Sequence, residues 1–123
     1  MDAKSLEKYK KSLLELRAQL LNRSLRASKD ALALNPDDLA DETDHAAAVI
    51  QQNISLDVQK RDRFLLNEIE HALSKFEIGM YGICEDSEEP IDEARLVAQP
   101  WTRYSVEAAE IREKRAKRFA NHG

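Results

Sequence analysis

The sequence contains few cysteine, glycine, proline and aromatic residues. Its 123 residues include one Cys, three Gly and three Pro, and aromatic residues make up 6% of the chain. The single cysteine excludes a disulfide bond within the chain. No apolar run approaches the roughly 18 residues that a membrane-spanning helix needs. This composition favours long solvated helices over a thick globular core.

Charged residues, by contrast, are abundant and make up 34% of the chain, with a formal net charge of -4. The negative balance argues against a general nucleic-acid binder, which usually needs a basic face. The first four residues, Met1–Lys4, lack the apolar segment of a secretory signal. We therefore expect a cytoplasmic protein that is not membrane-bound.

Two long helical segments are predicted before residue 79. Over residues 4–34, Leu6, Leu13 and Leu20 recur every seven residues, which is the spacing of a helix–helix interface. Asn35-Pro36 ends this segment. A second helix follows to about residue 76, and its apolar residues are spaced by three and four: Ala47, Ile50, Ile54, Val58, Leu65, Ile69, Ala72 and Phe76. The pattern predicts a mainly all-α protein in which residues 1–78 form a long antiparallel coiled-coil hairpin with its tip near 35–46.

Residues 79–123 differ in composition and are predicted to form a second, small globular region. This region holds the only Cys and the only Trp of the chain. We expect turns and up to two short strands, followed by a C-terminal helix from about Ser105, a plausible N-cap, to Phe119. The expected core residues are Tyr81, Ile91, Trp101 and Tyr104.

The predicted tip of the hairpin is acidic. Residues 30–44 contain no Lys or Arg and six acidic residues: Asp30, Asp37, Asp38, Asp41, Glu42 and Asp44. One interpretation is a solvated turn whose carboxylates cap the second helix. The other is a probe that enters a site rich in cations, where field focusing would strengthen the attraction.

Several motifs resemble the DksA/TraR family of RNA polymerase regulators. Residues 41–46, DETDHA, resemble the tip motif D-x-x-D-x-A, and residues 79–85, GMYGICE, resemble G-x-Y-G-x-C-E. The resemblance covers roughly residues 5–118, with further matches in order and spacing at Ile91, Arg95, Leu96, Ala98, Pro100 and Ile111–Lys114.

The resemblance implies a transcription regulator rather than an enzyme. Family members bind bacterial RNA polymerase and insert the hairpin through its secondary channel toward the active site, which shifts the stability of promoter complexes without requiring DNA contact. By the resemblance, Asp41, Asp44 and Ala46 would face the polymerase active site. Arg61 and Leu65 would contact the rim of the channel.

The chain departs from the family at the zinc finger. Most members carry four zinc-binding cysteines in the pattern C-x2-C-x17-C-x2-C, whose places fall here on Cys84, Ser87, Ser105 and Ala108. Serine is a poor zinc ligand and alanine is none. We therefore expect a degenerate zinc-finger-like region with no metal and no other cofactor.

The remaining thiol of Cys84 has two interpretations. It is either a residual buried thiol or a redox-sensitive one. The neighbouring acidic residues Glu85 and Asp86 are expected to raise its pKa and so to lower its reactivity.

A second departure concerns guanosine tetraphosphate, which some members bind through basic side chains. The corresponding positions fall on Glu68, Gln99 and Ala109. Because a phosphorylated anion needs Lys or Arg, we expect weak or absent binding of this alarmone.

The C-terminal helix ends in a basic run, with five cations in residues 112–118. One interpretation is that these cations interact favourably with the negative end of the helix dipole. The other is that they contact an acidic surface of the polymerase.

Two other classes of function stay open at this point. One is a structural or adaptor coiled coil that no longer acts on polymerase. The other is metal-assisted hydrolysis by the tip carboxylates, or stimulation of transcript cleavage inside the polymerase. The sequence shows no nucleophile–base pair and no Gly-rich phosphate loop that would support an enzyme of its own.

Overall fold

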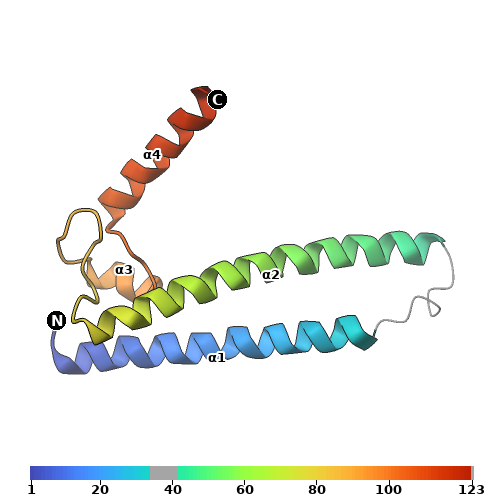
Figure 1. Ribbon diagram of the computed structural model, residues 1–123, viewed down its shortest axis with the longest axis horizontal. Coiled ribbons are helices and arrows are strands. Elements are labelled where there is room, and N and C mark those ends of the chain that lie inside the picture. Colours follow the sequence, from blue (N-terminus) through green and yellow to red (C-terminus); the bar gives the residue numbers. More distant parts are fainter. Residues whose placement is uncertain (34–41, 123) are drawn as a thin grey trace. The chain divides into compact units, whose positions relative to one another are not determined.

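The computed structural model describes the backbone of residues 1–33 and 42–122 and the side chains of residues 1–29 and 45–120. It contains helices α1 (Ala3–Ala33), α2 (Glu42–Glu77), α3 (Glu93–Ala98) and α4 (Val106–His122), shown in Figure 1. Within these ranges there is no β-strand, only an isolated antiparallel bridge between Ile83 and Pro90. No helix in the described part is long and apolar enough to cross a membrane. The mainly all-α prediction is confirmed.

The chain divides into two compact units. One comprises residues 1–14 and 68–123, and the other comprises residues 15–67. In each unit a stretch of α1 lies beside a stretch of α2 that runs in the opposite direction (Figure 1). The predicted division into domains at residue 78 stays a prediction.

The two long helices have well-defined ends in the first unit. Asp2 caps α1, because its Oδ1 accepts a hydrogen bond of 2.8 Å from the backbone N–H of Ser5. Gly79 adopts a positive φ of 71° just after α2. The N–H of Gly79 donates a hydrogen bond to the carbonyl of Phe76. The N–H of Met80 donates one of 2.9 Å to the carbonyl of Lys75. This pattern is a Schellman motif, for which glycine suits the left-handed position, and it places the end of α2 where the sequence predicts it.

Two of the three heptad leucines of α1 are buried as predicted, and Leu6 is half-buried. Leu13 is 0% exposed and Leu20 is 1% exposed. The predicted apolar stripe of α2 is buried over only part of its length. Ile50 and Ile54 are more than half exposed, whereas Ile69 and Ala72 are fully buried. In the second unit, Arg23 of α1 pairs with Asp62 of α2 at 3.2 Å.

The region after Gly79 contains a helix that the sequence analysis does not predict. The chain turns back on itself through the Ile83–Pro90 bridge and a 2.7 Å hydrogen bond from the N–H of Ile91 to the carbonyl of Gly82. It then forms α3, whose Leu96 is completely buried.

The expected core of this region is right for two residues of four. Tyr81 and Ile91 are buried, but Trp101 and Tyr104 are only half-buried. Two contacts explain the difference. The Tyr81 ring stacks on Phe76 with its centroid 4.1 Å away, whereas the Tyr104 ring lies under the guanidinium of Arg112 at 4.1 Å. Leu96 of α3, which is completely buried, belongs to this core in addition to Tyr81 and Ile91.

Candidate functional site

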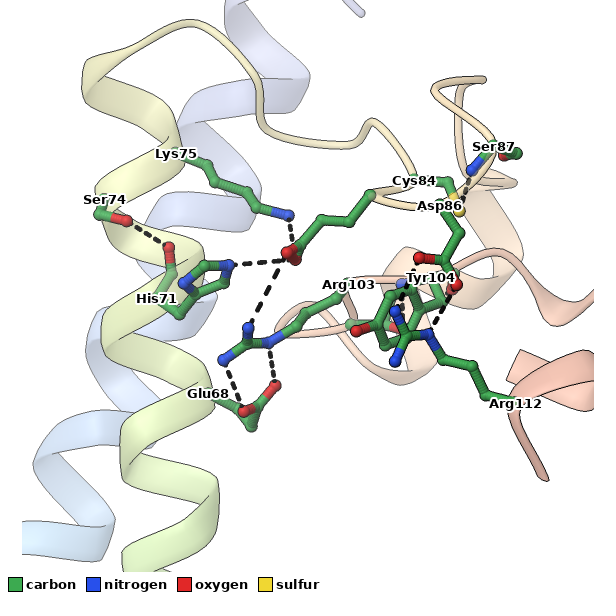
Figure 2. A network of polar contacts seen from close by, with 12 residues as sticks. Glu68, His71, Ser74, Lys75, Cys84, Asp86, Ser87, Arg103, Tyr104 and Arg112 are labelled. Atoms are coloured by element: carbon green, nitrogen blue, oxygen red, sulfur yellow. Dashed lines mark hydrogen bonds and ion pairs between the residues drawn. The ribbon is translucent and has the colours of Figure 1, made fainter. Parts of the chain in front are cut away.

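A network of charged side chains joins α2 to the loop that follows it and to the segment before α4 (Figure 2). On α2, Glu68, His71 and Lys75 are three and four residues apart, so they lie along one face of the helix. All three point toward the loop of residues 84–87 and the segment around Arg103 (Figure 2).

Arg103 makes the most geometrically complete contact of this network. Its Nε and Nη2 donate hydrogen bonds of 2.7 and 2.9 Å to the two carboxylate oxygens of Glu68. Its Nη1 lies 3.8 Å from Glu85. The Glu68 hydrogen bond raises the pKa of Arg103 and outweighs partial burial, which would lower it. A bidentate arginine–carboxylate pair fixes both distance and direction, so it anchors the segment before α4 to α2.

Glu85 links the loop to α2 from the other side. Its Oε2 accepts a hydrogen bond of 3.2 Å from Nζ of Lys75 and lies 3.1 Å from Nε2 of His71. Lys75 is 9% exposed, and Glu85 supplies the opposite charge beside its ammonium group. Burial alone would raise the pKa of Glu85, but hydrogen bonds from Lys75 and His71 outweigh it and lower that pKa.

Arg112 connects α4 to the same loop. Its Nε and Nη2 donate to the carboxylate of Asp86 at 2.6 and 2.7 Å. Its guanidinium also covers the face of Tyr104, an arrangement that adds a cation–π attraction. The pair raises the pKa of Arg112 and lowers the pKa of Asp86.

The positions of the four expected zinc ligands lie together beside this network. Cys84 is 1% exposed, and the N–H of Ser87 donates to its Sγ at 3.5 Å. Ser105 is near enough to the thiol for its backbone and its hydroxyl to lower the pKa of Cys84. The hydroxyl of Ser105 accepts a 3.3 Å hydrogen bond from the N–H of Ala108, which confirms Ser105 as the N-cap of α4.

The pKa expectation for Cys84 is wrong. Burial raises the pKa of this thiol, but hydrogen bonds from Ser87 and Ser105 together lower it to about 6. The acidic neighbours Glu85 and Asp86, whose carboxylates pair with Lys75 and Arg112, are not among the groups that shift this pKa. The pKa of this thiol is lowered by Ser87 and Ser105, and not raised by the carboxylates of Glu85 and Asp86.

The residues expected to contact polymerase belong to the other unit. Arg61 is exposed and Leu65 is half-buried on α2, four residues apart and therefore on one face. Ala46 is exposed near the start of α2. Asp41 and the side chain of Asp44 lie outside the described residues. The roles of these residues stay predictions.

The sequence is similar to those of known proteins. Residues 79–114 match the family described as the prokaryotic dksA/traR C4-type zinc finger. The RNA polymerase-binding transcription factor DksA of Caulobacter vibrioides is 36% identical over 117 residues, which cover 95% of this chain and 82% of that protein. The chain belongs to the DksA/TraR family. The expected family membership is confirmed.

Solved structures of the DksA/TraR family share the fold. The transcription factor DksA2 from Pseudomonas aeruginosa matches with a TM-score of 0.78 at 30% identity, covering 94% of this chain and 88% of that one. An RNA polymerase binding protein and transcriptional regulator from Chlamydia trachomatis matches with a TM-score of 0.56 at 26% identity, covering 93% of each chain. The predicted helical hairpin with a zinc-finger-like region and a C-terminal helix is thereby confirmed.

The four positions do not offer the ligands that a DksA/TraR zinc finger uses. A structural zinc ion takes four thiolate or imidazole ligands in a tetrahedron. Cys84, Ser87, Ser105 and Ala108 supply one thiol, two hydroxyls and a methyl group. Across the described residues, no group of three or more His, Cys, Asp or Glu side chains is arranged to hold a metal ion. The donor set therefore does not fit zinc.

Sequence reasoning missed the charged network. The spacing of Glu68, His71 and Lys75 could have marked a polar face on α2. Their partners Glu85 and Arg103 lie 10 to 35 residues away along the chain, so only the fold pairs them.

Proposed function

We propose that this chain is a transcription regulator that binds bacterial RNA polymerase and inserts the tip of its helical hairpin into the secondary channel, and that it does so without zinc. The observation that carries the proposal is 36% identity across 82% of a relative named as RNA polymerase-binding. The function is regulation through binding, because the family's named members are transcription factors rather than enzymes.

The hairpin supports the proposed mode of binding. A pair of antiparallel helices is narrow, and residues 30–44, where the sequence passes from one arm to the other, contain six acidic residues and no Lys or Arg. We infer that Asp41, Asp44 and Ala46 face the active site of the polymerase. Carboxylates brought there would act on its cations and basic groups without any chemistry of their own.

The second arm supports a contact at the rim of the channel. Arg61 is exposed, and Leu65 lies one turn further along the same face of α2. Arginine is enriched among the residues that dominate protein–protein binding energy, and the side chain of Leu65 offers apolar surface beside it. We infer that these two residues anchor the hairpin while the tip reaches inward.

We further propose that guanosine tetraphosphate acts weakly or not at all through this chain. The carboxylate of Glu68 is held by Arg103, Gln99 is uncharged and exposed, and Ala109 is half-buried. None of these three positions offers a cation to a phosphate.

The proposal is tested by binding to core RNA polymerase and by transcription in vitro from a ribosomal promoter. Asp44→Asn is expected to retain binding and lose its effect on transcription. Glu7→Gln, which removes an exposed carboxylate of α1, is the matched control and should behave like the parent chain. Unchanged transcription by Asp44→Asn would remove the tip mechanism.

A second pair of variants tests the rim. Arg61→Ala should weaken binding by at least ~10-fold, which corresponds to about 1.4 kcal/mol. Arg63→Ala removes another exposed arginine of α2, two residues away and therefore on a different face, and should bind normally. No binding of the parent chain at micromolar concentration would instead favour an adaptor coiled coil.

A further inference from the structure

The region after α2 matches a zinc-finger family over residues 79–114 but lacks three of the four cysteine ligands. In a four-cysteine finger the metal ties two short segments together, here residues 84–87 and 105–108. The N–H of Glu85 donates a 2.9 Å hydrogen bond to the carbonyl of Arg103, just before the second segment, and Cys84 and Ala108 are both buried. Some other interaction must therefore hold these segments in place.

We propose that two arginines do the work of the cross-link that zinc would make: Arg112 ties the loop of residues 84–87 to α4, and Arg103 ties the segment before α4 to α2. Both make bidentate contacts, to Asp86 and to Glu68 respectively. Each contact joins residues 26 or more positions apart. The proposal stands apart from polymerase binding and shares with it only the lack of zinc.

The attachment of α4 shows why Arg112 matters. Ala108 is the only fully buried residue of this helix among residues 106–120, and residues 110–120 are all exposed. Apolar packing therefore holds α4 only by its first turn. Arg112 makes the next contact along the helix, through Asp86 and the Tyr104 ring. Losing this contact should leave α4 attached by one turn alone.

The two arginine links should differ in their sensitivity to salt. The side chains of Arg112 and Asp86 are 51% and 37% exposed, whereas those of Arg103 and Glu68 are 30% and 15% exposed. Exposed pairs are screened more strongly than partly buried ones. The stability of this region should thus depend on ionic strength, mainly through Arg112, and not on metal.

The first measurement is thermal unfolding of the full chain, followed by fluorescence of Trp101, the only tryptophan. Arg112→Gln should lower the midpoint by roughly 4 to 8 °C at low salt. Arg118→Gln makes the same charge change two turns later, where the side chain is exposed, and should leave the midpoint unchanged. A chelator should have no effect on the parent chain. An unchanged midpoint in Arg112→Gln, or a chelator-sensitive parent, overturns the proposal.

The decisive measurement returns the zinc ligands. The variant Ser87→Cys/Ser105→Cys/Ala108→Cys completes four cysteines with Cys84, and it should bind about one equivalent of Zn²⁺. With zinc bound, Arg112→Gln should lower the midpoint by less than half as much as in the parent chain, because the metal supplies the same cross-link. Failure to bind zinc, or an undiminished effect of Arg112→Gln in the zinc-bound form, contradicts the proposal.

A double-mutant cycle tests the proposal even if the cysteine variant does not fold. Arg112→Gln and Asp86→Asn are combined in the parent chain. If the two side chains act as one link, the double variant should unfold at about the same midpoint as either single variant. Strictly additive losses would show that they do not form a link and would overturn the proposal.

Discussion

Removing the guanidinium of Arg103 should destabilise the unit formed by residues 1–14 and 68–123. Arg103→Gln removes the two hydrogen bonds that Arg103 donates to Glu68, whose side chain is only 15% exposed. Hydrogen bonds to charged groups contribute about 1.5 to 3 kcal/mol each, and fully exposed ion pairs contribute about 0.2 to 1 kcal/mol. The Arg103–Glu68 pair is partly exposed, so its contribution to stability should lie between that of a buried charged hydrogen bond and that of a fully exposed ion pair. We therefore expect a loss of about 2 kcal/mol.

Urea denaturation followed by Trp101 fluorescence measures this loss. For a unit of about 70 residues, a change of 2 kcal/mol corresponds to a thermal shift on the order of 10 °C. Arg103→Lys keeps the charge but cannot make the bidentate contact, so it should lose about half as much. Arg63→Gln, at an exposed position on α2, should stay within about 0.5 kcal/mol of the parent.

The cycle that combines Arg103→Gln with Glu68→Gln isolates the pair itself. A coupling energy of about 1 to 2 kcal/mol is expected for side chains in direct contact. A coupling energy near zero, or a stability of Arg103→Gln within about 0.5 kcal/mol of the parent, would refute the reasoning that this pair anchors the segment to α2.

Three further predictions concern the same unit. Leu96→Ala truncates a side chain that is 0% exposed and should cost about 2 to 5 kcal/mol in urea denaturation; a loss below about 1 kcal/mol would show that α3 is not part of the core. Tyr81→Phe removes the hydroxyl that donates to the carbonyl of Pro100 at 2.8 Å and should cost about 1 kcal/mol, with the helical circular dichroism unchanged. Burial raises the pKa of Glu85, but hydrogen bonds, the largest from Lys75, bring it below its ordinary value of 4.5. The stabilisation by Glu85 is therefore present above that value and is lost as the pH falls through the lower folded pKa. Glu85→Gln should make stability less dependent on pH in that acidic range, and an unchanged pH profile would contradict the shift.

The helices could be predicted from the sequence because their signals are local and repeated. Leu13 and Leu20 repeat with a heptad period and are both buried, and Gly79 marks the end of α2 by a left-handed turn. The N-cap at Ser105 was predictable for the same reason. Such features depend on residues a few positions apart, which a sequence displays directly.

Features set by the tertiary structure were missed. Helix α3 has only six residues, too few to show a helical period. The pKa of Cys84 was predicted in the wrong direction because the prediction considered the carboxylates of Glu85 and Asp86, whereas the fold brings Ser87 and, from 21 residues away, Ser105 to the thiol. The exposure of Ile50 and Ile54 likewise follows from the placement of the helices rather than from the period of their residues.

The central claim is that the hairpin carries its tip into the interior of RNA polymerase. Site-specific photo-crosslinking tests it most directly, with a benzophenone side chain placed at Ala46, which is exposed near the start of α2. A second probe at Glu107, exposed on α4, serves as the comparison. We predict that the probe at position 46 crosslinks to polymerase residues next to the active site, and that the probe at position 107 crosslinks only outside the channel. Binding without any crosslink from position 46 to the channel or the active-site region would contradict the account.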